Sequence, residues 1–375
     1  PNVPFCIENV GDVPVEIGLY NETEDVRDQC VYSYDLKTWQ NYKILPNESI
    51  STPIVLSNNG DRVYIKASFH DVAPKFGTTR FYLLNESANT KIRARGNIAS
   101  LNDVDENEYK LNYLTAPKYC YYEMFKDCTS LVQGPDLPAT NLETQSYFRM
   151  FYGCTSLVQA PNLPAEVLTE SCYDDMFRKC TGLVTPPTIS AKTLAKYCCR
   201  DMFADCTSLT QAPELPATTL AEYCYENMFA RCTSLTQASE LPATILAPAC
   251  YYGMFAYCTS LTQAPKLPAT KLANICCLQM FCYCTSLTQA PELPATTLAD
   301  SCYESMFSGC TSLTQAPELP AKWLLEYCYQ WMFDGCTKLN YVKCLATNGF
   351  TSTGCTTGWL RDVSSTGTFE CDNKK

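Results

Sequence analysis

The sequence predicts an α/β solenoid preceded by a small all-β sandwich, and three observations support this prediction. One 26-residue pattern recurs nine times, each copy joins an amphipathic segment to a proline-rich segment, and the first 105 residues are β-rich and lack the pattern. A fixed period of about 20 to 50 residues is typical of arrays in which each unit buries its apolar face against its neighbours. The repeats are therefore expected to form one array.

Nine cysteines mark the period, each 26 residues after the one before it: Cys128, Cys154, Cys180, Cys206, Cys232, Cys258, Cys284, Cys310 and Cys336. No copy contains an insertion or deletion. The constant spacing predicts nine coils of equal size. A propeller would need a period of roughly 40 residues or more with four strands per unit, so the length of the unit excludes it.

Within one copy, residues 219–232 predict an amphipathic helix. At about 100° per residue, one face collects Leu220, Cys224 and Met228, and the opposite face collects polar side chains such as Glu222 and Glu226. The remaining half of the copy, TSLTQAPELPAT, cannot be helical because Pro213 and Pro216 favour extended conformations before them. Each coil is therefore expected to combine a helix with a strand of only a few residues.

The cysteines and methionines occupy repeat columns, which predicts a core rather than a site. All nine methionines share one column and each precedes a phenylalanine, while seventeen of the 25 cysteines fall in two columns. Nine members of one column cannot all pair, so buried thiols without disulfides are expected. The dense cluster Cys276, Cys277, Cys282 and Cys284 lacks a CxxC pair, so no metal ligand is predicted.

Composition argues against several function classes. The single histidine, His70, lies outside the repeats, and no phosphate-binding glycine loop is present, so no catalytic residue and no cofactor are predicted. A net charge of −11 disfavours nucleic acid as a partner. No apolar run reaches about 18 residues, so no membrane span is expected.

The flanking regions give the expected domain boundaries. Residues 1–105 are predicted to form a β-sandwich of the immunoglobulin-like kind, in which Cys6 and Cys30 either form a disulfide or remain thiols. Residues 106–113 form a polar junction, and the repeats occupy 114–337. Residues 338–375 break the pattern and are predicted to cap the last coil with Trp359, Leu360 and Phe369.

Four aromatic residues on the predicted outer face of the helix are candidates for partner binding. This face varies from copy to copy, whereas TSLTQAPELPAT barely changes. Free drift of solvated positions explains such variation, and so does recognition, because soluble domains seldom expose several aromatic side chains without use. The candidates are Tyr122, Phe148, Tyr252 and Trp331.

The stretch MFADCTSLTQAPELPATTLAEYCYENMF, residues 202–229, resembles the 26-residue repeat of bacterial surface proteins, a BspA-like form of the leucine-rich repeat. The likeness spans about residues 114–345. It implies a right-handed solenoid displayed at the cell surface or secreted, without enzymatic activity, that acts in adhesion by binding a protein or glycan on another cell or particle. Similar arrays occur in phages of gut bacteria, so a virion component is the alternative that the resemblance implies.

Overall fold

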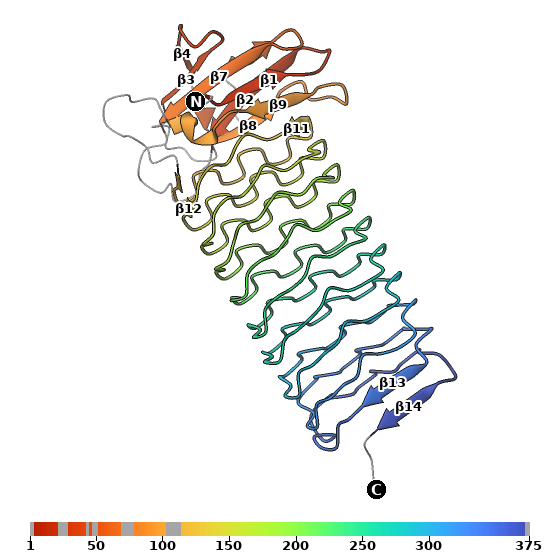
Figure 1. The fold of residues 1–375 in the computed structure, drawn as a ribbon. Helices are drawn as coiled ribbons and strands as arrows, with labels where there is room; N and C mark the ends of the chain where they lie inside the picture. The colour runs from red at the N-terminus through yellow and green to blue at the C-terminus, as the bar shows by residue number, and fades with distance from the viewer. Residues whose placement is uncertain are drawn as a thin grey trace. The chain divides into compact units, whose positions relative to one another are not determined.

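The structure is a computed structural model that describes residues 4–21, 29–42, 45–46, 52–68, 79–102 and 114–371. The chain divides into two compact units. Unit 1 comprises Pro1–Val167 and Asp175–Ile189, and unit 2 comprises Leu168–Asp174 and Ser190–Lys375. The predicted junction 106–113 and His70 lie outside the described residues. Figure 1 shows the stacked coils that the repeats form within each unit.

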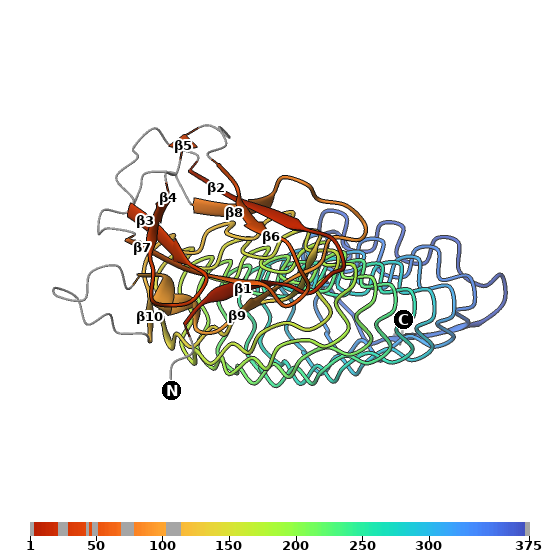
Figure 2. The ribbon, with the colours of Figure 1, turned by 90° about the horizontal axis from the view of Figure 1, so that it is seen from above.

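Unit 1 begins with two β-sheets (Figures 1 and 2). One has the strand order β11-β9-β1-β7-β3-β4, and in the other β2 lies between β5 and β6 and also pairs with β8. Their strands are β1 (Cys6–Asn9), β2 (Val15–Asn21), β3 (Gln29–Ser33), β4 (Gln40–Tyr42), β5 (Leu45–Pro46), β6 (Ile54–Leu56), β7 (Arg62–Ser68), β8 (Thr79–Leu83), β9 (Ile92–Arg95) and β11 (Leu131–Gln133). A 3-10 helix η1 (Ile98–Asn102) follows β9, and β10 (Thr115–Ala116) pairs in parallel with β12 (Asn141–Leu142).

The alternation of side chains explains why these segments form strands. In β7, Val63 and Ile65 are buried, whereas Arg62, whose side chain lies on the opposite face of the strand, is exposed. A period of two is what a strand with one buried face requires. The all-strand character of this region agrees with the sequence, and the immunoglobulin-like sandwich over residues 1–105 stays a prediction.

The structure does not bring the two cysteines of this region together. Cys6 lies on β1 and Cys30 on β3, and β7 separates these strands. Cys6 pairs with Tyr64 of β7 and Cys30 with Ala67, three residues further along. Two strand spacings alone amount to roughly 9.5 Å, beyond the roughly 7 Å between Cα atoms that a disulfide can bridge. Of the two alternatives for Cys6 and Cys30, this fold therefore places them too far apart for a disulfide, and both side chains are buried.

The sheets of unit 1 continue directly into the first repeat. Strand β9 pairs in parallel with β11, which belongs to the repeat. Phe81 stacks on the repeat residue Phe125 with ring centroids 5.3 Å apart, and Phe5 lies 6.4 Å from the same ring. The terminal coil of an array needs a cover for its core. Here Phe5 and Phe81 extend the phenylalanine column by which the repeats pack.

The predicted helix over residues 219–232 is absent, as are its equivalents, because the described residues contain no α-helix. This segment is a ladder of tight turns. Tyr223, Asn227 and Arg231 have φ angles of 55°, 50° and 60°. Positive φ at every fourth residue is incompatible with a right-handed helix, and at the third position of a turn it is the mark of type II. We call residues 221–232 and their equivalents in each repeat the turn ladder.

Hydrogen bonds of two kinds hold the turn ladder. The N–H groups of Tyr225, Asn227 and Phe229 donate to carbonyls 25 residues further on, in the next coil. The N–H groups between them, such as that of Met228, donate back three residues within the same coil. Neighbouring coils are thus joined by backbone bonds on this side too, which an α-helix would not allow because its N–H groups bond within the helix.

Burial in the turn ladder follows a period of four. Cys224 and Tyr225 are buried, as are Met228 and Phe229, whereas the residues between these pairs are half-buried. A period of four residues is close to the 3.6-residue period of an α-helix, which is why the spacing of the apolar residues resembles that of an amphipathic helix. The methionine and phenylalanine columns form the core, as predicted. Phenylalanine rings of successive coils stack with centroids 5.4 to 5.7 Å apart within each unit.

Within each unit, extended halves of neighbouring repeats pair in parallel. Gln133 pairs with Gln159 in unit 1, and Gln211 pairs with Gln237 in unit 2. The Gln211 Nε2 donates to the Gln237 Oε1 over 3.5 Å. This bond joins identical amides of two adjacent coils, the arrangement found where identical side chains stack.

The column cysteines fill the core as small thiols that still form hydrogen bonds. Cys232 is fully buried, and its Sγ donates to the Phe203 carbonyl of the preceding coil over 3.1 Å. The same bond, 3.0 to 3.1 Å long, recurs at Cys154, Cys180, Cys258, Cys284, Cys310 and Cys336. A thiol suits this position because it is apolar and compact and can still donate weakly.

Unit 2 ends in β13 (Tyr341–Cys344) and β14 (Thr368–Cys371), which pair in parallel. Residues 353–361 extend the turn ladder by accepting hydrogen bonds from the last complete repeat. Trp359 stacks on Tyr329 with centroids 6.2 Å apart, and Phe369 contacts Trp359 edge-on at 5.8 Å. Leu360 is half-buried. These contacts are those expected of a cap, and the boundaries 338–375 stay a prediction.

Replacing Ile275 with asparagine is expected to stabilise unit 2. Ile275 has a φ of 53°, which a β-branched side chain tolerates poorly and asparagine tolerates well. The expected gain in the free energy of unfolding is about 1 kcal/mol, measured by chemical denaturation. Ile245→Asn is the control, since Ile245 is not among the residues with positive φ. An equal effect of both variants would show that polarity, and not backbone strain, is responsible.

Candidate functional site

The candidate aromatic residues of unit 1 are not both available to a partner. Phe148 is only 7% exposed, so its prediction as a surface residue is wrong. Its ring stacks on half-buried Tyr122 with centroids 4.7 Å apart, and the Arg149 guanidinium lies 4.7 Å from its centroid on this part of the turn ladder. Stacking between neighbouring coils accounts for this aromatic pair.

The two candidates of unit 2 differ in exposure. Tyr252 is half-buried, and burial raises the pKa of its hydroxyl. Trp331 is 39% exposed, and its indole lies against Gly358, where a Cβ would meet the ring at 2.3 Å. Of the four predicted residues, Trp331 alone is an open aromatic side chain. The predicted aromatic face is therefore not a continuous patch.

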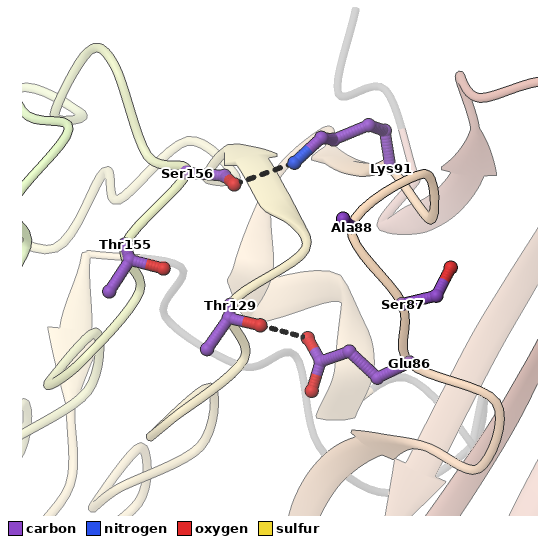
Figure 3. A pocket seen from close by; sticks show the side chains of 7 residues that line it. All are labelled: Glu86, Ser87, Ala88, Lys91, Thr129, Thr155 and Ser156. Carbon is purple, nitrogen blue, oxygen red and sulfur yellow. Dashed lines mark hydrogen bonds between the residues drawn. The ribbon is translucent and has the colours of Figure 1, made fainter.

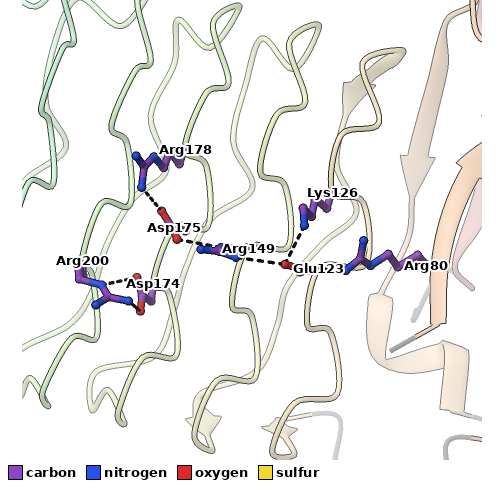
Figure 4. A network of polar contacts seen from close by, with 8 residues as sticks. All are labelled: Arg80, Glu123, Lys126, Arg149, Asp174, Asp175, Arg178 and Arg200. Atoms are coloured by element: carbon purple, nitrogen blue, oxygen red, sulfur yellow. Dashed lines mark hydrogen bonds and ion pairs between the residues drawn. The ribbon is translucent and has the colours of Figure 1, made fainter. Parts of the chain in front are cut away.

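The variable positions of the turn ladder in unit 1 hold a charge network (Figure 4). The Glu123 carboxylate is 4% exposed and forms ion pairs with Arg80, Lys126 at 3.1 Å and Arg149 at 3.6 Å. Arg80 belongs to β8, so this network also joins the N-terminal sheets to the repeats. A buried carboxylate requires such partners, because burying it alone would be very costly.

Asp175 continues the network in unit 1, and a separate ion pair occurs in unit 2. Asp175 is buried and accepts from the Arg149 Nε at 2.9 Å and from the Arg178 guanidinium at 3.1 Å. In unit 2, Arg200 and Asp174 form a bidentate pair with bonds of 3.1 and 2.8 Å. The residues that vary at these positions therefore include oppositely charged side chains that pair between adjacent coils. Free substitution at solvent-exposed positions does not account for all of the variation.

A stacked tyrosine pair in unit 2 forms an exposed aromatic edge. Tyr257 and Tyr283 are 41% and 46% exposed, and their centroids lie 4.9 Å apart at an angle of 12°. The Arg231 guanidinium lies 5.5 Å from the Tyr257 centroid, and the Tyr283 ring covers Gly309. We call Arg231, Tyr257 and Tyr283 the aromatic edge.

The aromatic edge lies outside the two repeat columns that contain the predicted aromatic residues. Its three residues share one repeat column, in which two adjacent tyrosines are bordered by Arg231 and Gly309, and this run is the sequence signal for the site. Trp323 and Phe350 are more exposed, at 60% and 59%. However, no ring contact joins them among the described residues, so they do not make a comparable surface.

A polar pocket of about 530 Å³ lies within unit 1 (Figure 3). One wall is the loop after β8, with Glu86 and Lys91, and the other wall consists of threonine and serine residues of the repeats. Glu86 accepts from the Thr129 hydroxyl at 2.8 Å, and Lys91 donates to the Ser156 hydroxyl at 2.8 Å. The charged groups of the pocket are therefore used to hold this loop against the repeats.

Within the described residues, no group of three or more histidine, cysteine, aspartate or glutamate side chains is arranged to hold a metal ion. No helix within the same residues is long and apolar enough to cross a membrane.

The fold defines a repeat protein whose 26-residue units pair through both their extended halves and their turn ladders. The family model described as BspA type leucine-rich repeat region matches residues 115–262 and 248–355, with six copies. The chain belongs to this family, which is typically surface-associated, non-enzymatic and suited to protein binding. No curated protein and no solved structure matched the chain.

Proposed function

We propose that the protein is a non-enzymatic adhesion protein displayed at a cell surface or secreted, and that its repeats bind a protein on another cell or particle. Family membership supports a protein-binding scaffold. The aromatic edge supports the position of the contact, because tyrosine and arginine dominate the binding energy of interfaces.

The aromatic edge fits a protein partner for physical reasons. Its two rings are stacked on each other and bounded by Arg231, so they are held in place before binding and lose little side-chain freedom on contact. Each tyrosine offers an apolar ring with a polar hydroxyl, a combination that suits a mixed protein surface. The unvarying TSLTQAPELPAT face offers no such local feature. Trp331 is a second contact candidate on the turn ladder.

Replacing both tyrosines of the aromatic edge with serine is expected to weaken partner binding about tenfold or more, since truncated interface anchors each cost over about 1 kcal/mol. The measurement is binding of the purified chain to a panel of immobilised extracellular glycoproteins. The matched control replaces Tyr197 and Tyr223, which also stack, with centroids 5.0 Å apart, but are half-buried.

Three outcomes distinguish the alternatives. Loss of binding only in the Tyr257→Ser, Tyr283→Ser variant supports the proposal, and equal loss in the control variant contradicts it. Binding that disappears when glycans are removed from the panel would identify a glycan ligand instead of a protein. Antibody labelling that finds the chain in phage particles, and not on intact cells, would replace surface display with the virion alternative.

A further inference from the structure

The parallel strands at the end of unit 2 place two cysteines side by side. In the pairing of β13 with β14, Cys344 and Cys371 are register partners. Neighbouring strands lie about 4.7–4.9 Å apart, and a disulfide accepts Cα separations of about 4.4–6.8 Å. The backbone spacing therefore suits a bond between these two residues.

The two side chains also share one face of the strand pair. Val342 and Cys344 of β13 are buried, and Phe369 of β14 lies on that face because it contacts Trp359. Since side chains alternate along a strand, Cys371 lies on the same face as Phe369. The opposite face holds Glu370, which hydrogen-bonds to Tyr341.

The two thiols differ in access to solvent. Cys371 is exposed, whereas the other 24 cysteines are buried or, for Cys120, half-buried. Cys344 is 4% exposed, and burial raises the pKa of its thiol, with the neighbouring Cys371 adding to the rise. A dissolved oxidant therefore reaches Cys371 first, and Cys344 is placed to react with what forms there.

We propose that Cys344 and Cys371 form a redox-modification site in which a reversible disulfide ties β14 to β13. The oxidant is a small-molecule disulfide such as oxidised glutathione. The Cys371 thiolate attacks one glutathione sulfur and releases one glutathione thiol, leaving a mixed disulfide. The Cys344 thiolate then attacks the Cys371 sulfur and releases the second glutathione, so two protein thiols are oxidised and one glutathione disulfide is reduced.

The bond would fix the element that covers the last repeat. All four residues of β14 are exposed, and within the described chain its strand partner is β13. Phe369 of β14 packs on Trp359, which in turn stacks on Tyr329 of the last repeat. Oxidation would therefore hold this contact, and reduction would allow the terminal strand to fray.

The test treats the full chain with oxidised glutathione, quenches it by alkylation and identifies products by peptide mass spectrometry. The expected product is a Cys344–Cys371 cross-link with the loss of two alkylatable thiols per chain. Hydrogen exchange at the β14 amides should slow about tenfold or more and recover after reduction with dithiothreitol.

Two variants sharpen this result. Cys344→Ser should stop at the glutathione adduct on Cys371, and Cys355→Ser should react as the unmodified chain does, because Cys355 is buried and bonds to the Phe350 carbonyl. An adduct that persists on Cys371 in the unmodified chain, a Cys371-linked dimer, or no reaction would each overturn the proposal. The unmodified chain alone can give each of these results, so the test does not depend on the folding of the variants.

Discussion

Unit 2 is expected to unfold cooperatively by about pH 10, because the column cysteines that it buries ionise only in the unfolded chain. Burial raises the pKa of Cys128, Cys328 and Cys336 to about 12, and raises that of twelve other column cysteines in the same direction. These thiols stay protonated in the fold and ionise in the unfolded chain.

The direction of the pH effect follows from proton linkage. A thiol whose pKa is raised in the folded chain contributes its full stability below 9.0, the ordinary thiol pKa. This stability is lost as the pH rises from 9.0 towards the pKa of the thiol in the folded chain. At pH 10 each such thiol favours the unfolded chain by about 1.4 kcal/mol. The eleven of these thiols that lie in unit 2 together give about 15 kcal/mol, which reaches the upper end of the 5–15 kcal/mol typical of a folded domain.

Circular dichroism and thiolate absorbance, recorded together during an alkaline titration, check this prediction. Both signals should change in a single step and recover on return to neutral pH under reducing conditions. Thiolate absorbance that rises at pH 10 while the circular dichroism stays native would contradict it, because the thiols would then ionise inside the fold.

Replacing Glu123 with glutamine is expected to lower the free energy of unfolding of unit 1 by about 3 kcal/mol, the lower end of the range for breaking a buried ion pair. Glu123 is 4% exposed and faces Arg80, Lys126 and Arg149, which would be left without this carboxylate. The lower end applies because these cations are 13% to 35% exposed and keep part of their hydration.

Hydrogen exchange of the amides of Phe125 and Phe151 measures this loss within unit 1. The control is Glu222→Gln in unit 2, whose ion pair with Lys196 is 42% exposed on both sides and is expected to contribute much less, because solvent screens it. Equal effects of the two substitutions would show that the Glu123 network is no more than a surface ion pair.

The candidate site could be predicted only in part. The sequence identified the variable side of the repeat and Trp331 on it, but it could not show that Phe148 is covered or that Glu123 is buried among cations. Those outcomes depend on which residue of the neighbouring coil lies opposite. The same holds for Tyr257 and Tyr283, which are a candidate because their rings stack across adjacent coils.

The sequence by itself determined the 26-residue unit, the methionine, phenylalanine and cysteine columns of the core, and the extended half of each coil. Each follows from spacing and proline positions, which are local. It also contains a signal for the turn ladder. Aspartate, asparagine and glycine, which tolerate positive φ, recur at the fourth-residue columns, as in Asp205, Asn227 and Gly253.

Only the tertiary structure decided that the other half of each coil is a turn ladder and not a helix. Packed helices need interaxial distances of about 8–10 Å, whereas the phenylalanine rings of adjacent coils lie 5.4 to 5.7 Å apart. Parallel pairing of the extended halves imposes this short spacing on the whole coil. Tandem turns fit it, because every second N–H is left to bond with the next coil.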